Sequence, residues 1–280
     1  MKKNVWVIKV GGQAIRNQVH VDSLMSAMKS LVDKGVFIVV VHGGGPQADE
    51  VQKKLGIPVK KINGRRITDK EALEVIKMVY AGTINKNLVS SAIKHQLSAV
   101  GISGIDAQLA LVSKRPVQKV VEQKTGKAQI INFGYVGDIK TIDVKILKVL
   151  LSKNYLPIIA CLGVDDYGQI FNINADTLAT AIACEMHAEK LIFVTDVDGI
   201  AAHKGSTQYF SELTIIEAQK MIKNGKITDG MIPKIENIET ALKKGLQCVR
   251  LVGALSKKNQ WIKAFEQQIY GTTIIGGNYE

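Results

Sequence analysis

A run of β-branched residues that ends in three consecutive glycines constrains the fold of this chain most strongly. Residues 36–41 (VFIVVV) have the composition of a buried strand, glycines occupy positions 43–45, and Pro46 is a residue type favoured at the start of a helix. Unpaired backbone N–H groups and the positive end of the helix dipole both attract anions. The sequence therefore predicts a strand–turn–helix unit with an anion site at the turn.

Alternating strand and helix patterns extend along most of the 280 residues. We predict strands at 5–10, 36–41, 156–160, 190–195 and 247–252, helices at 20–34, 46–55, 69–80, 84–98, 143–153, 174–187, 214–223 and 233–244, and hairpins within 109–140. This alternation is typical of an α/β protein with a mainly parallel central sheet. Such sheets bind ligands at the carboxyl ends of their strands, and the two halves of the chain both supply such ends.

Composition narrows the class of protein. Apolar residues make up 46% of the chain and charged residues 22%, which are ordinary globular values. The net charge of +12 favours anionic ligands, namely nucleotides, acidic metabolites, an acidic partner protein or nucleic acid. The lysines are dispersed, however, and no basic stripe alternates with aromatic residues, which argues against nucleic acid.

The expected location is the cytoplasm. The first strand begins almost at Met1, which leaves no room for a signal or transit peptide, and no apolar run reaches the roughly 18 residues that span a bilayer. Cys161, Cys184 and Cys248 are widely separated and odd in number, so we expect reduced core cysteines.

Two common phosphate-binding motifs fit poorly. Both Gly-Lys pairs, at 126–127 and 225–226, lack the Ser or Thr that a P-loop requires next. Residues 43–48 (GGGPQA) satisfy the dinucleotide fingerprint, but an arginine pair, Arg65 and Arg66, stands where an acidic residue should end a second strand. An oxidoreductase is therefore a minor alternative.

Three charged residues in apolar surroundings suggest phosphate chemistry. Lys9 lies in the first strand, just ahead of Gly11 and Gly12, and a buried lysine needs an anionic partner. Asp176 lies in the first turn of an apolar helix and needs a cation. Lys234, in the first turn of another helix, opposes the helix dipole unless an anion binds there.

The order of these motifs resembles the amino acid kinase family and, within it, the acetylglutamate kinases. The resemblance runs from about residue 7 to 245. The segments that carry it are 8–12 (IKVGG), 42–46 (HGGGP), 64–69 (GRRITD), 85–86 (NK), 101–106 (GISGID), 172–176 (NINAD), 195–199 (TDVDG) and 228–234 (TDGMIPK).

The resemblance implies a three-layer αβα sandwich, with an N-terminal lobe (1–164) for the acyl amino acid and a C-terminal lobe (165–280) for ATP. It implies phosphorylation of the side-chain carboxylate of N-acetyl-L-glutamate, in arginine and ornithine biosynthesis. The implied phosphoryl-binding and positioning residues are Lys9, Lys234 and Asp176; the acceptor-binding residues are Gly44, Gly45, Arg66 and Asn172; the nucleotide-binding residues are Gly11, Gly12, Asp196, Val197, Asp198, Gly199, Ile200, Ala201, Lys226, Ile227 and Thr228.

The chemistry of such a reaction fits these residue types. A carboxylate acceptor is already ionised and needs no general base, so we expect His42 to be structural. Arg66 suits the α-carboxylate of the substrate, whereas Arg65 is expected to be solvated. The chain has no evident carboxylate cluster for a metal, so Mg²⁺ is expected to bind through the ATP phosphates.

Some features depart from the pattern and leave alternatives open. The likeness thins after Val249, and no helix precedes the first strand as it does in the arginine-inhibited hexameric members of the family. We therefore expect a homodimer that arginine does not inhibit. The alternatives are a kinase for aminoadipate or glutamate linked to an acidic carrier protein, which the net charge would suit, and a non-catalytic amino-acid sensor.

Overall fold

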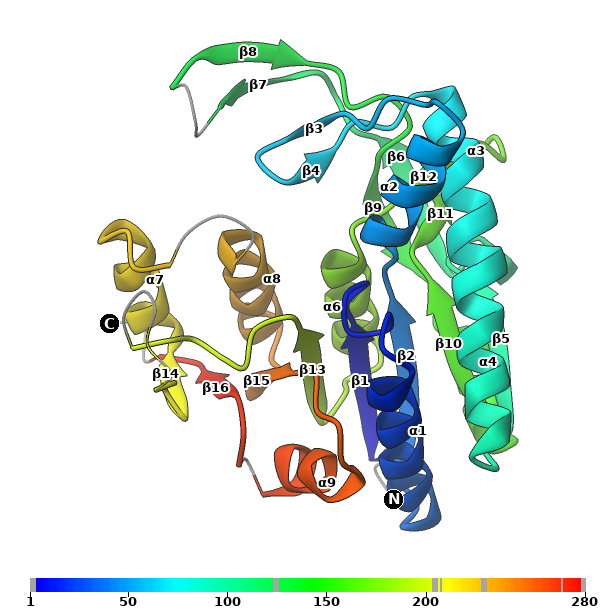
Figure 1. Ribbon diagram of the computed structural model, residues 1–280, viewed down its shortest axis with the longest axis vertical. Helices are drawn as coiled ribbons and strands as arrows, with labels where there is room; N and C mark the ends of the chain where they lie inside the picture. The colour runs from blue at the N-terminus through cyan, green and yellow to red at the C-terminus, as the bar shows by residue number, and fades with distance from the viewer. Residues whose placement is uncertain are drawn as a thin grey trace.

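The structure is a computed structural model that describes residues 4–122, 126–202, 206, 208–227, 231–267 and 269–277. Its centre is an eight-stranded sheet in the order β14 (Glu212–Thr214), β16 (Thr272–Ile275), β15 (Cys248–Gly253), β13 (Lys190–Thr195), β1 (Val5–Val10), β2 (Phe37–His42), β10 (Leu156–Ala160) and β5 (Ala99–Ser103). Every neighbouring pair is parallel except β15 with β16. The prediction of a mainly parallel central sheet is confirmed (Figure 1).

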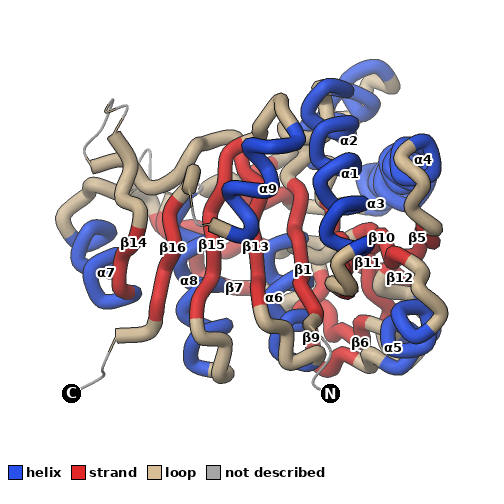
Figure 2. The backbone as a smooth tube through the Cα atoms, turned by 90° about the horizontal axis from the view of Figure 1, so that it is seen from below, coloured by secondary structure: helices blue, strands red, loops and turns tan. Residues whose placement is uncertain are grey.

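Helices cover both faces of this sheet, which gives the three layers (Figure 2). One face carries α1 (Gln18–Asp33), α4 (Asn85–Lys94) and α9 (Lys258–Glu266), and the other carries α5 (Lys145–Ser152), α6 (Ala175–Glu185) and α8 (Ile232–Lys243), with α7 (Ile215–Lys223) beside α8. Two further helices, α2 (Gly45–Lys54) and α3 (Lys70–Lys77), lie beyond the carboxyl ends of the central strands. The αβα sandwich is therefore confirmed.

Smaller sheets extend the N-terminal part of the molecule. One contains β12 (Ile170–Asn172), β11 (Leu162–Val164), β6 (Ala110–Lys114) and β9 (Gly137–Ile142). Two hairpins, β3 (Lys61–Ile62) with β4 (Arg65–Arg66) and β7 (Gln118–Val121) with β8 (Ala128–Ile131), project over α8 (Figure 1). The predicted hairpin region is thus confirmed, whereas a boundary between lobes at residues 164–165 stays a prediction.

Burial explains why the central strands read as continuous apolar runs. All six residues of β1 are buried, and so are five of the six in β2, because helices cover both faces of a parallel sheet. Hydrophobic burial is the main favourable term in folding. A charged residue in such a strand, as Lys9 is in β1, therefore requires a specific partner.

Sequence patterns missed the elements with short or irregular signals. The strand β5 was not foreseen, and the two helices expected at 69–80 and 84–98 are joined by a π-helical segment, η1 (Met78–Ile84). Nor were α9 and β16 predicted in the divergent C-terminal part. In the structure α9 packs against α1, and β16 pairs with β15, so this segment completes the fold.

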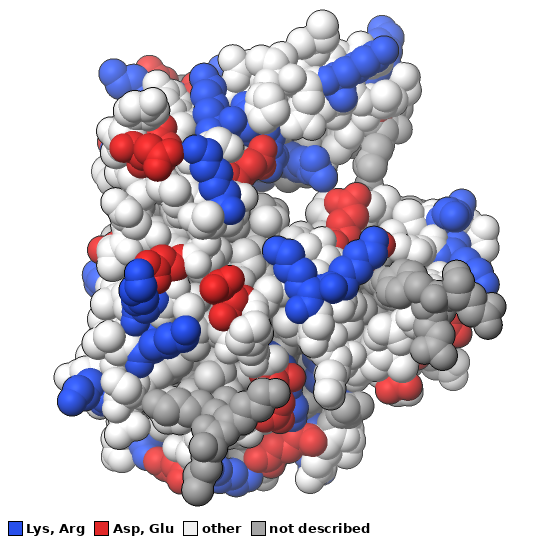
Figure 3. Space-filling view, turned by 180° about the vertical axis from the view of Figure 1, so that it is seen from behind, with Lys and Arg blue, Asp and Glu red and all other residues white. Residues whose placement is uncertain are grey.

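The surface charges are mixed in sign, and of the three cysteines that we expected in the core only Cys161 is buried, whereas Cys184 and Cys248 are partly exposed. On the face shown in Figure 3, basic and acidic side chains are interspersed. Cys161, Cys184 and Cys248, all within the described residues, are free. None of the helices in the described ranges combines the length and the apolar character needed to cross a bilayer.

Candidate active site

Two glycine turns meet at the carboxyl edge of the central sheet. The first follows β1 and contains Gly11 and Gly12; the second follows β2 and leads into α2, which begins at Gly45. A Cβ atom on Gly12 would lie 2.8 Å from Cδ of Pro46, and Gln47 donates from Nε2 to the carbonyl oxygen of Gly12 at 2.7 Å. The turns are therefore packed directly against each other, and side chains are excluded between them.

A buried charge cluster lies beside these turns. Nζ of Lys9 is 2.7 Å from Oδ1 of Asp176, and Nζ of Lys234 is 3.4 Å from Oδ2 of the same carboxylate. Lys9 and Asp176 are only 7% and 6% exposed. A Cβ on Gly11 would lie 3.8 Å from Nζ of Lys9, so the ammonium group lies close to the first turn. The three residues that the sequence selected for phosphate chemistry are brought together.

The electrostatics of the cluster leave an excess of positive charge. Burial alone would raise the pKa of Asp176, but the charges of Lys9 and Lys234 outweigh it and hold the pKa below its usual value. One ionised carboxylate thus faces two ammonium groups in a region of low water content. A net positive charge in such a place favours an anionic ligand.

The cluster is assembled by helix starts as well as strand ends. Asn174 caps α6, since its side chain accepts the N–H of Thr177 at 3.0 Å. Asp176 follows in the first turn, and Ala175 lies next to Gly43, whose Cβ would be 3.6 Å from that of the alanine. The second glycine turn and the N-terminus of α6 therefore share one site.

Gly44 faces a helix rather than open space. A Cβ atom there would lie 2.3 Å from Cδ1 of Ile84 and 2.9 Å from Cδ1 of Tyr80, both in η1. Gly45 is different, because its nearest contact would be Nη2 of Arg66 at 3.9 Å. The absence of a side chain at Gly44 is therefore required by packing, whatever the turn also binds.

The Arg66 side chain is held by hydrogen bonds to α2. Its guanidinium donates to the carboxylate of Asp49, to the side-chain oxygen of Gln52 and, at 3.0 Å, to the carbonyl oxygen of Gly45. Sequence reasoning missed Asp49 and Gln52, although both lie on α2 at helical spacing after the glycines. Arg66 is thereby fixed against the start of α2, beside the second glycine turn.

Asn172 and His42 both bond to residues of the N-terminal part. Asn172 is the last residue of β12, the strand that precedes α6, and its Nδ2 donates to Oγ1 of Thr68 at 3.1 Å. His42 is fully buried; burial lowers its pKa to about 4, against a smaller opposing effect of the Gly43 carbonyl. Its Nε2 lies 3.2 Å from Nδ2 of Asn85. The imidazole is neutral at pH 7 and forms part of the scaffold.

Apart from Gly11 and Gly12 in the first glycine turn, the predicted nucleotide residues lie on two separate segments of the C-terminal part. Asp196, Val197 and Asp198 are exposed after β13, while the N–H of Ile200 donates to Oγ1 of Thr272 at 2.8 Å. A Cβ on Gly253 would lie 2.1 Å from Oδ1 of Asp198, so the end of β15 touches this loop. The divergent C-terminal segment therefore supports the loop.

The second segment follows α7. The N–H groups of Lys226 and Ile227 donate to the carbonyl oxygen of Met221, at 2.9 and 3.2 Å. Lys226 is exposed and Ile227 is buried. Thr228, the last predicted nucleotide residue, lies outside the described residues.

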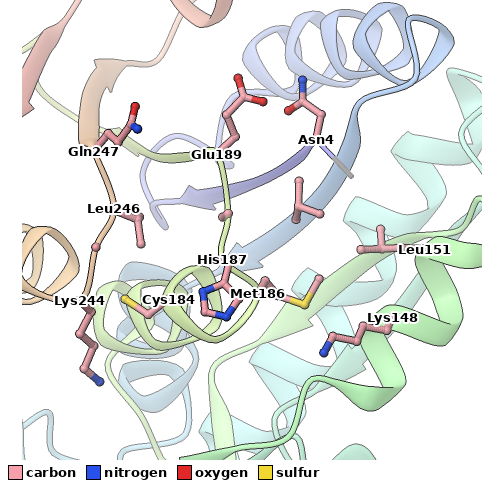
Figure 4. A pocket seen from close by; sticks show the side chains of 13 residues that line it. Asn4, Lys148, Leu151, Cys184, Met186, His187, Glu189, Lys244, Leu246 and Gln247 are labelled. Carbon is pink, nitrogen blue, oxygen red and sulfur yellow. The ribbon is translucent and has the colours of Figure 1, made fainter. Parts of the chain in front are cut away.

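A cavity lies at the opposite edge of the sheet (Figure 4). Its volume is about 900 Å³, and it is bordered by the starts of β1, β13 and β15 and by the ends of α5, α6 and α8. Lys148, His187 and Lys244, all exposed, lie along it. None of the predicted ligand-binding residues within the described ranges lines this cavity.

Comparisons with known proteins agree with the fold. The model of the amino acid kinase family matches residues 4–251, and the chain belongs to this family. It is similar to the acetylglutamate kinases of Methanococcus maripaludis (strain C6), 38% identical over 271 residues, and of Hydrogenobaculum sp. (strain Y04AAS1), 38% identical over 274 residues; each match covers 96% of this chain and 91% of the relative.

Solved structures show the same architecture. A structure described as smu.665 from Streptococcus mutans UA159 superposes with a TM-score of 0.79 at 29% identity and covers 99% of this chain and 100% of its own. An N-acetylglutamate synthase from Neisseria gonorrhoeae superposes with a TM-score of 0.82 at 21% identity, and the match covers 100% of this chain and 61% of its own. At this identity the match shows a similar fold and nothing further.

Proposed function

We propose that the protein is an acetylglutamate kinase, which transfers the γ-phosphoryl group of ATP to the side-chain carboxylate of N-acetyl-L-glutamate and forms N-acetyl-L-glutamyl 5-phosphate. The reaction belongs to arginine and ornithine biosynthesis. The single observation that carries the proposal is the buried Lys9–Asp176–Lys234 cluster beside two glycine turns. The relatives at 38% identity supply the choice of substrate.

The barrier to this reaction is electrostatic. A carboxylate must approach a polyphosphate, and negative charge spreads over the transferring group in the transition state. In the proposed mechanism Lys9 and Lys234 contact that group from two sides, and the N–H groups of the glycine turns add further donors. Asp176 is a positioning residue that holds both ammonium groups in place before the ligands bind.

No proton needs to be removed from the acceptor, because the carboxylate is ionised at pH 7. This agrees with a buried, neutral His42 that bonds to the backbone and to Asn85 instead of facing a ligand. On the acceptor side we assign Gly44, Gly45, Arg66 and Asn172 to the substrate. Arg66 would contact its α-carboxylate from a guanidinium already oriented by Asp49.

The nucleotide side is assigned to Gly11, Gly12, the loop from Asp196 to Ala201, Lys226, Ile227 and Thr228. Among the residues that the structure describes, no group of three or more His, Cys, Asp or Glu side chains could hold a metal ion. In this proposal Mg²⁺ would bind through the ATP phosphates, with water as its other ligand. It would there neutralise phosphate charge.

We also propose the organisation into an N-terminal acceptor lobe (1–164) and a C-terminal ATP lobe (165–280), a homodimer, and a cytoplasmic location. The end strand of the central sheet, β5, and the exposed side chains of Met78 and Ile93 near it offer a surface for the second subunit. Light scattering tests the dimer, and a hexamer would contradict it. Activity should be insensitive to added arginine.

One assay tests the function against its alternatives. ATP consumption is measured with N-acetylglutamate, with free glutamate, with glutamate or aminoadipate attached to an acidic carrier protein, and without acceptor, and the acyl phosphate is trapped with hydroxylamine. Turnover with N-acetylglutamate alone is expected. If only glutamate or aminoadipate attached to an acidic carrier protein is phosphorylated, the carrier-dependent kinase is the correct reading; binding of the amino acid without any turnover would indicate a sensor.

A further inference from the structure

The two hairpins of the N-terminal part share a small apolar cluster, to which β3 contributes Ile62, β7 Val120 and β8 Ile131. Ile62, Phe133 and Val136 make a small buried cluster that is separate from the main core. The side chain of Asn63 donates to the carbonyl oxygen of Val121 at 2.8 Å and links one hairpin to the other. We call β3–β4 and β7–β8 the hairpin unit; its internal packing favours movement as one body.

A groove of about 290 Å³ separates the hairpin unit from the start of α8. Its N-terminal side is lined by Ile62, Asn63, Arg65, Gln118, Lys119, Val120, Val121 and Phe133, and its other side by Ile232, Pro233 and Glu236. Figure 3 shows the molecule notched between its upper part and the part below. A charged contact crosses this groove: Nη2 of Arg65 lies 3.6 Å from Oε2 of Glu236.

Both partners of this contact sit beside residues of the proposed active site. Neighbouring residues of a strand point to opposite faces, so Arg66 reaches α2 while Arg65 reaches α8. Residues two apart on a helix are separated by about 200°. Accordingly Lys234 reaches Asp176, and Glu236 reaches the hairpin unit. The expectation that Arg65 is only solvated is therefore incomplete.

We propose that Arg65 and Glu236 are a pair of positioning residues, which sets the distance between the hairpin that carries Arg66 and the helix that carries Lys234. The proposal rests on the proposed function, in which Arg66 contacts the acceptor and Lys234 the phosphoryl group. The pair contacts neither reactant. Its role is to favour the arrangement in which the two reactants are aligned, and small misalignments of reacting groups are costly.

The expected effect is modest, because both side chains are about half exposed. Exposed ion pairs are worth a factor of about two to five in an equilibrium. The test is a double-mutant cycle of Arg65→Ala, Glu236→Ala and the double variant, together with the charge swap that combines Arg65→Glu with Glu236→Arg. Lys60→Ala is the matched control, since the pair of Lys60 with Asp69 does not involve α8.

Each single variant should lower kcat for N-acetylglutamate about two- to fivefold. The kcat of the double variant should be no lower than that of either single variant. The charge swap should restore most of the wild-type kcat. The differences should vanish at about 1 M salt, where the Debye length is about 3 Å. Independent, additive losses, or a charge swap no better than the double variant, would overturn the proposal.

Hydrogen exchange in the ligand-free protein separates this proposal from the proposed function. Either single variant should speed amide exchange in β3–β4 and in the first turn of α8, whereas Lys60→Ala should not. If amide exchange in both segments is unchanged in the single variants, Arg65 and Glu236 are not positioning residues, even if the protein is an active kinase. If instead the wild type fails to phosphorylate N-acetylglutamate but exchange responds as expected, the function is wrong and the coupling stands.

Discussion

The carboxyl and amino edges of the central sheet carry basic residues in opposite settings. At the carboxyl edge Lys9 and Lys234 share a buried carboxylate, whereas at the amino edge Lys148, His187 and Lys244 are exposed around a cavity of about 900 Å³. Exposed charges are hydrated and screened, so their interactions are weak. Chemistry is therefore expected where charge is desolvated, and not at the cavity of the amino edge.

The same two helices connect these edges. The first turns of α6 and α8 carry Asp176 and Lys234, and the opposite ends of both helices border the cavity. A cation at a helix C-terminus complements the dipole, which accounts for Lys244 without any ligand. A cation at an N-terminus opposes the dipole. Lys234 is in that unfavourable place, which an anionic ligand would relieve.

Asp176→Asn should have the largest effect on stability. The buried Lys9 and the partly buried Lys234 would lose their shared counter-charge, and removal of one partner from a buried ion pair costs about 3–5 kcal/mol. Urea denaturation at pH 7 measures the loss in the free energy of unfolding. A loss below about 1 kcal/mol, the value typical of exposed pairs, would show that the cluster is not desolvated.

His42 should make stability depend on pH. Its pKa falls from 6.5 in the unfolded chain to about 4 in the fold, so the unfolded state binds more protons between these values. The contribution of His42 to the free energy of unfolding should therefore decrease by about 3 kcal/mol as the pH falls from 6.5 to 4. His42→Gln should lack this pH-dependent decrease.

His187→Asn, at the exposed amino edge, is the matched control and should keep the pH profile of the wild type. Denaturant melts at several pH values provide the measurement. Identical profiles for wild type and His42→Gln would contradict the burial argument.

Gly44→Ala and Gly45→Ala separate packing from turn formation. The added methyl group at Gly44 meets Ile84 and Tyr80, and overpacking of this kind costs about 1–3 kcal/mol. At Gly45 the nearest atom is 3.9 Å away, so thermal unfolding should change little. Equal destabilisation of the two variants would show that the clash at Gly44 is not what matters.

The smallest effect is expected at the cavity. Lys148→Met and Lys244→Met change exposed side chains, which contribute within about 0.5 kcal/mol. Catalytic rate should stay within about twofold, the kinetic equivalent of that energy. A larger loss of activity in either variant would break the contrast between the edges and assign a role to the cavity.

The fold was predictable wherever the periodicity was strong. The parallel strands β1, β2, β10, β13 and β15 follow from continuous apolar runs, and most of the helices between them follow from 3.6-residue patterns. Short strands such as β11 and β12 carry three residues each and give no such signal. The antiparallel β16 and the helix α9 lie where the family resemblance thins, and only tertiary packing reveals them.

The site was predictable where a residue type conflicts with its surroundings. Lys9, Asp176 and Lys234 stand out because a charge in a buried strand or an apolar first turn demands a partner. Asp49 and Glu236 do not stand out in the sequence, since an acidic residue within an amphipathic helix is ordinary. Their partners, Arg66 and Arg65, are adjacent in sequence, and only the structure shows that they reach different helices.

The most direct test of the central claim compares Lys9→Met with Lys244→Met in the hydroxylamine assay, with N-acetylglutamate and ATP saturating and both variants shown to be folded by thermal melting. The account predicts that Lys9→Met loses about a hundredfold or more in kcat, the loss seen when a charge-stabilising donor is removed, while Lys244→Met matches the wild type. Comparable activity in the two variants would contradict it.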